Sequence, residues 1–123
     1  MLSSDPPPAL VIHAERHQAC RGTRVLVRGL LRGTYGNGSD VTVVVVTATI
    51  AGPHGFSATR RQMLLPDDNR FVRFGIPLSR RAPAGTYRLT AAVRQEEPPA
   101  SAVLARAHDR RAVRVSGHCG AKR

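Results

Sequence analysis

Hydrophobic and polar residues alternate along much of the chain in short runs separated by turn-forming residues. Between Val25 and Val93, runs rich in valine, leucine, isoleucine, threonine and phenylalanine are interrupted at near-regular intervals by glycine, proline, asparagine and aspartate. Alternation with a period of two is typical of half-buried β-strands, and evenly spaced turns favour a β-sandwich. Since no stretch of a dozen residues has a convincing helical period, the pattern predicts an all-β protein.

The pattern predicts seven strands. We place them at Leu10–Arg16, Thr23–Leu31, Val41–Ile50, Phe56–Leu65, Phe71–Leu78, Tyr87–Val93 and Ala112–Ser116. The clearest alternation points these residues inward: Val25, Val27, Gly29, Leu31, Val72, Phe74, Ile76, Leu78, Tyr87, Leu89, Ala91 and Val93. Pro77 cannot donate a hydrogen bond to a neighbouring strand, so it indicates a strand end or an edge.

Two segments leave alternatives open. Val43–Val46 is apolar at every position, so this strand is either central and covered on both faces, or its outer face meets something else. Ser101–His108 fits either one helical turn or an extra strand. We expect that an extra strand there would reverse the direction of the last strand.

Three segments resemble bacterial and phage immunoglobulin-like domains, which recur as accessory modules in surface and virion proteins. They are the turn at Gly36–Gly38, the strand at Phe71–Leu78 and the segment Ala82–Leu89, which contains Pro-Ala-Gly-Thr-Tyr. The resemblance implies an immunoglobulin-like sandwich of about seven antiparallel strands in two sheets. It also implies that Tyr87, just after Gly85, packs at a corner with its hydroxyl bonded to nearby backbone. The core tryptophan and cysteine pair of antibody domains are absent.

These features predict one domain with two short extensions. We assign residues 1–9 to an extended proline-rich arm, residues 10–117 to the sandwich and residues 118–123 to a basic tail. No apolar run is long enough to span a membrane. The start, Met1–Pro6, lacks the basic and apolar regions of a secretory signal. We expect a virion or extracellular location, with the cytoplasm left open.

The two cysteines, Cys20 and Cys119, are expected to meet. Successive strands of a seven-strand sandwich alternate in direction, so the first connection and the end of the last strand share one end. We therefore predict a disulfide, which would close nearly the whole chain into a loop. Two alternatives stay open: reduced thiols in a cytoplasmic protein, or a metal site formed with His17 and His118. An extra strand at Ser101–His108 would separate the cysteines.

The charge of the chain favours acidic partners. The net charge is +11, carried by eighteen arginines and one lysine, although GC-rich coding also inflates arginine. The predicted topology separates the charged loops by sign. One end collects Asp5, Asp40, Asp67, Asp68, Glu96 and Glu97. The opposite end, a predicted basic pole, collects His17, Arg21, His54, Arg80, Arg81, His118, Lys122 and Arg123.

Residues with catalytic or metal-binding chemistry form no recognisable constellation. His13, Glu15 and His17 are typical of a solvated strand surface, and Asp67–Asn69 is typical of a turn. We therefore expect no catalytic residues, no metal and no cofactor. Aromatic residues are scarce, which disfavours specific nucleic-acid recognition and leaves only nonspecific attraction to phosphate.

The sequence therefore predicts a non-catalytic structural or interaction module. In this reading it docks through its basic pole on a larger acidic assembly, for example as a virion decoration protein. The alternative is a secreted or cell-surface module that binds glycan or protein. The oligomeric state stays open.

Overall fold

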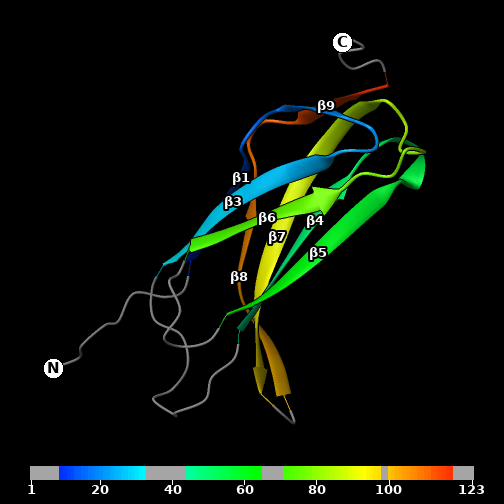
Figure 1. Cartoon of the computed structure of the whole chain (residues 1–123). Coiled ribbons are helices and arrows are strands. Elements are labelled where there is room, and N and C mark those ends of the chain that lie inside the picture. Colours follow the sequence, from blue (N-terminus) through cyan, green and yellow to red (C-terminus); the bar gives the residue numbers. More distant parts are fainter. Residues whose placement is uncertain (1–8, 33–43, 65–70, 98–99, 118–123) are drawn as a thin grey trace, which may run out of the picture.

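The computed structural model describes residues 9–32, 44–64, 71–97 and 100–117. Within these ranges the regular structure consists of nine β-strands and one short 3-10 turn, η1 (Pro53–Gly55). The strands form two sheets, and the chain is all-β as the alternation predicts (Figure 1).

The smaller sheet has three antiparallel strands. In order across the sheet these are β1 (Ala9–Ala14), β3 (Arg24–Arg32) and β6 (Phe71–Pro77). As expected for Pro77, it lies at the end of a strand, and that strand is at an edge.

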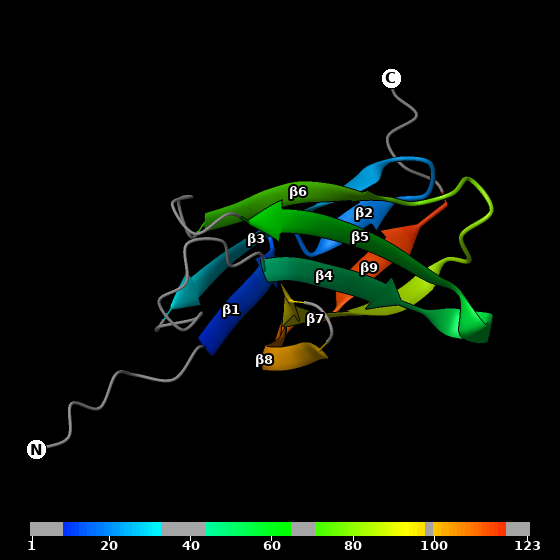
Figure 2. The same ribbon diagram turned by 90° about the horizontal axis from the view of Figure 1, so that it is seen from below.

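The larger sheet has six strands and is mixed. Its order is β2 (Gln18–Cys20), β9 (Val113–Ser116), β7 (Gly85–Glu97), β4 (Val44–Ala51) and β5 (Ser57–Leu64), with β8 (Ala100–His108) also paired to β7. The β2–β9 pair is parallel and the other pairs are antiparallel. This sheet is strongly curled, like half of a barrel (Figure 2). β8 lies beside β1 and β5 beside β6, so the two sheets approach each other along both sides.

The hydrophobic core fills the space between the sheets. The predicted inward positions of β3, β6 and β7 are confirmed, since Val27, Ile76 and Leu89 are completely buried and their neighbours two residues along the strand are buried or partly buried. The valine run is also explained. β4 is central, between β5 and β7, and Val45 is only 5 % exposed although it lies on the face opposite Val44 and Val46. Of the two alternatives, a central strand is therefore correct; its second face is covered at Val45, while Thr47 and Thr49 on that face are partly exposed.

The structure has two strands more than the expected seven. One is β8, so of the two alternatives for Ser101–His108 the extra strand is correct; the other, β2, was not expected. β2 has only three residues, and β8 is rich in alanine. The expectation that a strand at Ser101–His108 would reverse the last strand is wrong. β8 and β9 are both antiparallel to β7, so they run in the same direction along one edge of it, separated by a break at Asp109–Ala112.

Tyr87 stabilises the packing of the turns at one end of the molecule. Its buried hydroxyl group donates a hydrogen bond to the carbonyl oxygen of Pro83 at 2.6 Å. A side-chain carbon at Gly52 would lie 2.4 Å from the Tyr87 ring, and one at Gly85, where φ is +145°, would lie 2.7 Å from Pro53. Glycine is therefore required at both positions, and the corner before β7 packs tightly on η1. Burial raises the pKa of Tyr87, although the charge of Arg21 acts in the opposite sense.

Candidate functional site

Arginine dominates the described surface. Every arginine in the described ranges is exposed, and these residues lie on both sheets as well as in the connections. Of the carboxylate side chains that the structure describes, Glu15 and Asp109 are already held by internal contacts. Since arginine is exposed throughout the described surface, regions of this surface differ mainly in the side chains that lie beside the arginines.

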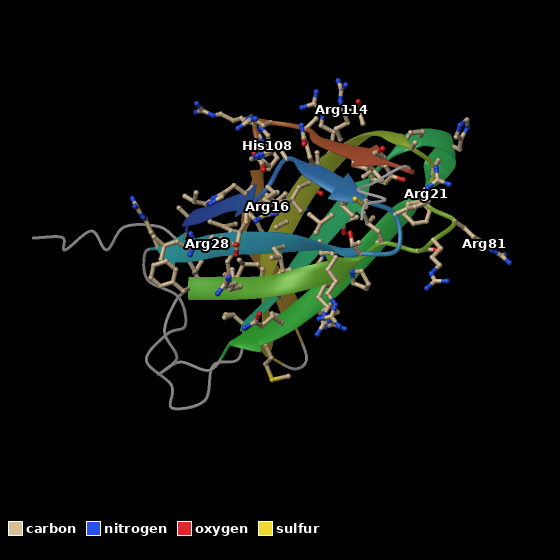
Figure 3. The ribbon with its side chains drawn as sticks, turned by 45° about the horizontal axis from the view of Figure 1, so that its top comes forward. Arg16, Arg21, Arg28, Arg81, His108 and Arg114 are labelled. Carbon is tan, nitrogen blue, oxygen red and sulfur yellow. The ribbon has the colours of Figure 1, made fainter. Side chains whose placement is uncertain are left out.

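Part of the predicted basic pole is assembled at one end. The backbone N–H of Arg21 donates to the carbonyl oxygen of Ser116, and that of Gly22 donates to the carbonyl oxygen of Leu78. The turn between β2 and β3, the end of β9 and the turn after β6 therefore lie together. Arg21 and Arg81 extend at this end in Figure 3. Arg80 lies against Gly22, and η1 carries His54 with φ of +57°.

The pole differs from the prediction in two respects. His17 is not part of an exposed basic surface, because it turns inward and bonds Asp109. Arginines on strand faces, such as Arg28 and Arg88, make the basic surface much wider than one end. The remaining predicted residues of both poles lie outside the described side chains: Asp5, Asp40, Asp67, Asp68, Glu96, Glu97, His118, Lys122 and Arg123.

The outer face of the smaller sheet combines arginine with exposed apolar side chains. We call this the small-sheet face: Val11, His13, Arg28, Leu30, Arg32, Phe71 and Arg73. Val11 pairs with Leu30 and Leu30 pairs with Phe71, so these three form an apolar row across the three strands. Val11 is 49 % exposed and Phe71 is 63 % exposed. Most of the exposed large hydrophobic side chains in the described ranges therefore lie on one sheet.

A basic row runs next to the apolar row. His13 pairs with Arg28, and Arg28 pairs with Arg73. The two rows border a groove of about 600 Å³, which Arg32 also lines. Glu15 accepts a hydrogen bond from Arg73 at 2.8 Å and lies 3.5 Å from the Nε of Arg28. The hydrogen bond from Arg73 holds the pKa of Glu15 below its usual value.

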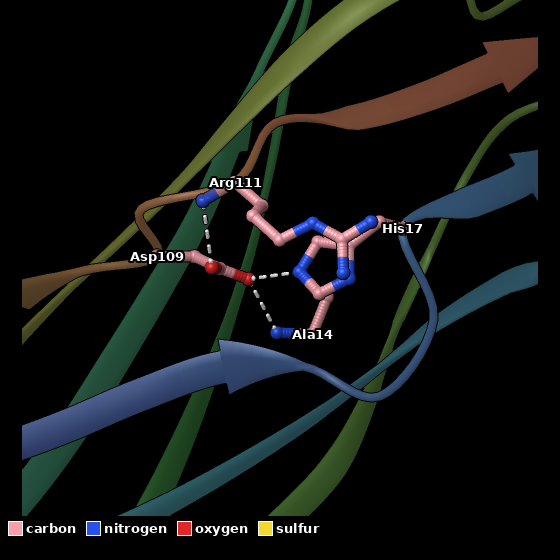
Figure 4. A network of polar contacts seen from close by, with 4 residues as sticks. All are labelled: Ala14, His17, Asp109 and Arg111. Atoms are coloured by element: carbon pink, nitrogen blue, oxygen red, sulfur yellow. Dashed lines mark hydrogen bonds and ion pairs between the residues drawn. The ribbon is translucent and has the colours of Figure 1, made fainter.

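Asp109 ties the break between β8 and β9 to the end of β1. Its carboxylate accepts hydrogen bonds from the N–H groups of Ala14 at 2.8 Å and Arg111 at 3.0 Å (Figure 4). The Nε2 of His17 lies 2.8 Å from the same carboxylate. Burial alone would raise the pKa of Asp109, but these contacts outweigh it and lower the pKa.

A second, polar groove lies beside this network. We call it the arginine groove; its lining is Glu15, Arg16, His17, Gln18, Thr86, Arg111, Ala112 and Arg114, and its volume is about 730 Å³. Gln18 pairs with Arg114 across β2 and β9, and Thr86 pairs with Arg114 across β7 and β9. Sequence reasoning missed this groove because its residues come from distant parts of the chain.

Cys20 lies at the end of β2, opposite Ser116 of β9. The described ranges contain no free cysteine. Cys119 and His118 lie outside the described residues, so the disulfide stays a prediction, but the pairing of Cys20 with Ser116 brings the chain to within three residues of Cys119. No group of three or more side chains suited to a metal ion occurs among the described residues.

Comparison with known proteins adds no relative. The chain matches no protein-family model, and no curated protein is significantly similar to it in sequence. No helix in the described ranges is long and apolar enough to cross a membrane.

Proposed function

We propose that this protein is a non-catalytic interaction module with an immunoglobulin-like sandwich, and that it docks on an acidic surface of a larger assembly, as a virion decoration protein would. The strand order supports the architecture. Constant-type immunoglobulin sandwiches place the first, second, fourth and fifth strands in one sheet and the third, sixth and seventh in the other. Without β2 and β8, the order here is β1-β3-β6 facing β9-β7-β4, which matches six of these strands. The fourth strand, β5, departs from the arrangement, because it pairs with β4 at the edge of the second sheet. The hydrogen bond from Tyr87 to Pro83 is a further feature of that fold.

The observation that carries the docking proposal is the small-sheet face. Exposed apolar side chains gathered on one surface are uncommon in proteins that act alone, and aromatic residues and arginine are both enriched at protein interfaces. Here Val11 and Phe71 stand beside Arg28 and Arg73 on a single sheet. This combination suits a partner segment that carries both a large apolar side chain and carboxylates.

Charge decides between an acidic partner and a second copy of the chain. The protein has a net charge of +11, so two copies facing each other would bring arginines together. Like charges across an interface suppress association, whereas opposite charges accelerate and strengthen it. An acidic partner therefore fits the small-sheet face better than self-association does.

Selection from a random peptide library tests this proposal. Peptides with one large apolar residue flanked by aspartate or glutamate should be enriched, and their binding should weaken as salt is added. Arg32→Glu should reduce the affinity about tenfold, equivalent to about 1.4 kcal/mol, while Arg88→Glu on the other sheet should leave it nearly unchanged. Enrichment of basic or neutral peptides, or equal losses in both variants, would refute the proposal.

A secreted or cell-surface module is the second candidate, and the position of Cys20 favours it. A disulfide to Cys119 would require an oxidising compartment. Mass spectrometry of the protein from its native source, alkylated before and after reduction, decides this point. Alkylation of both cysteines without reductant would exclude this second candidate and would leave the docking proposal intact.

A further inference from the structure

The arginine groove is lined by segments that connect strands as well as by strands, unlike the small-sheet face. Two chain segments that cross between strands lie next to each other there: residues 15–17, which lead from β1 to β2, and residues 109–112, which lead from β8 to β9. Asp109 in the second segment joins them, because its carboxylate contacts His17 in the first segment and accepts from Ala14, the residue just before it. The backbone N–H of Arg114 also donates to the carbonyl oxygen of His17 at 2.9 Å. These contacts therefore hold in place the backbone of the segments that line the groove.

Positive charge exceeds negative charge in this groove, because three arginines and one carboxylate, Glu15, line it. The Asp109 carboxylate is buried and already accepts from two backbone N–H groups and contacts His17. Glu15 contacts Arg73 and Arg28, on the side of the small-sheet face. Arg16, Arg111 and Arg114 form no ion pair with a carboxylate whose side chain the structure describes. Three arginines thus line one groove, and its lining carboxylate, Glu15, contacts Arg73 and Arg28 instead of them.

Uncharged hydrogen-bonding side chains complete the lining. Gln18, Arg114 and Thr86 occupy paired positions on three adjacent strands, and adjacent strands are about 4.8 Å apart. The amide of Gln18 and the hydroxyl of Thr86 therefore flank the Arg114 side chain. No aromatic residue except the imidazole of His17 lines the groove. Stacking of a nucleic-acid base, which relies on aromatic platforms, is not favoured by this lining.

From this arrangement we infer that the arginine groove binds a tetrahedral oxyanion, a phosphate or sulfate group. Guanidinium groups bind oxyanions through paired N–H donors. A carboxylate has two oxygens, which a single arginine can satisfy. A phosphate or sulfate group offers enough oxygens to accept from Arg16, Arg111 and Arg114 together. The inference rests on the groove alone and is independent of docking through the small-sheet face.

Side-chain NMR tests the inference directly. The Nε–Hε signals of the arginines are followed while sodium sulfate, sodium phosphate or sodium acetate is added at constant ionic strength. Sulfate or phosphate should shift the Arg111 and Arg114 signals along a saturable curve, and acetate should shift them little. Comparing the sulfate and phosphate arms shows which of the two groups the groove prefers, and saturable binding of either supports the inference. Thermal stabilisation is not a suitable readout, because sulfate stabilises proteins nonspecifically.

Variants separate the groove from general attraction to a basic protein. Arg114→Gln and Arg111→Gln should each weaken sulfate or phosphate binding at least fivefold. Arg60→Gln, at another exposed position, on β5, removes the same charge and should leave the affinity within twofold. Non-saturable shifts, equal shifts with acetate or equal weakening in Arg60→Gln would overturn the inference.

Discussion

The small-sheet face and the arginine groove use the same residue type in different surroundings. On the small-sheet face, Arg28 and Arg73 stand beside exposed apolar side chains, and Glu15 already contacts both of them. In the arginine groove, Arg111 and Arg114 stand beside an amide and a hydroxyl, and Asp109 binds the backbone N–H of Arg111. The first surroundings suit a protein segment with apolar and acidic side chains. The second suit a compact anion, so the neighbours of an arginine, more than its charge, distinguish what each region can bind.

The largest expected effect comes from removing the carboxylate that holds the backbone beside the groove. Asp109→Ala leaves the N–H groups of Ala14 and Arg111 and the ring of His17 without their shared acceptor. Unsatisfied buried polar groups are costly, so we expect the free energy of unfolding to fall by about 3 kcal/mol. Urea denaturation measures this change.

Asp109→Asn is the matched control, because an amide oxygen can still accept a hydrogen bond. Asp109→Asn should lower the free energy of unfolding clearly less than Asp109→Ala does. Sulfate binding should be lost in Asp109→Ala, while the folded fraction should still bind acidic peptides through the small-sheet face. Equal stability of Asp109→Ala and the native protein would show that the network does not hold this region together.

Acid should weaken the same network. The pKa of Asp109 is lowered in the folded protein, so the contribution of its carboxylate is complete above the unfolded-state pKa of about 3.9. This contribution is lost as the pH falls through the lower, folded-state pKa. Urea midpoints measured from pH 6 down to pH 2 should therefore decrease below about pH 4.

Asp109→Asn should have a flatter profile over that range. The pKa of Glu15 is also lowered, so part of the slope should remain in this variant. An unchanged slope would mean that Asp109 does not couple folding to pH.

Part of the fold and of the two surface regions could be predicted from the sequence, and part could not. Alternation identified the inward faces of β3, β6 and β7, because each has several well-spaced apolar residues over a long strand. It could not identify β2, because three residues are too few to establish a period. The arginines of the small-sheet face occupy outward strand positions and read as an ordinary solvated surface.

The groove was beyond sequence reasoning for a different reason. Arg16 and Arg111 line one groove although they are far apart in the sequence, and Asp109 binds the backbone of Ala14 across a separation of 95 residues. The sequence offers one weak signal, which is a single acidic residue, Asp109, at the end of an alanine-rich run and before two arginines. The expected disulfide used the same topological reasoning, and β9 does end beside Cys20.

A pair of equally exposed apolar residues sharpens the comparison further. Phe71 on the small-sheet face and Met63 on β5 are each 63 % exposed. Replacement of either by serine should change the free energy of unfolding by no more than about 0.5 kcal/mol, since surface substitutions have small effects. Phe71→Ser should nevertheless weaken acidic-peptide binding about tenfold, as loss of an interface anchor does. Met63→Ser should not; similar losses in the two variants would disconnect the apolar row from binding.

The smallest expected effect concerns Glu15, which contacts the small-sheet face and also lines the groove. Glu15→Gln removes a competing carboxylate from both regions. Because exposed ion pairs are weak, we expect only about a twofold gain in affinity for acidic peptides and for sulfate. Isothermal titration calorimetry measures both affinities, and a loss of affinity would show that Glu15 positions the arginines instead of competing for them.

Backbone and side-chain NMR mapping of both ligands on one sample tests the central claim most directly. An acidic peptide with one large apolar residue should shift the signals of Val11, Leu30 and Phe71, and sulfate should shift those of Thr86, Arg111 and Arg114. Each ligand should leave the other set nearly unchanged. Shifts from both ligands on the same residues, or spread evenly over every arginine, would contradict the assignment of two regions with different chemistry.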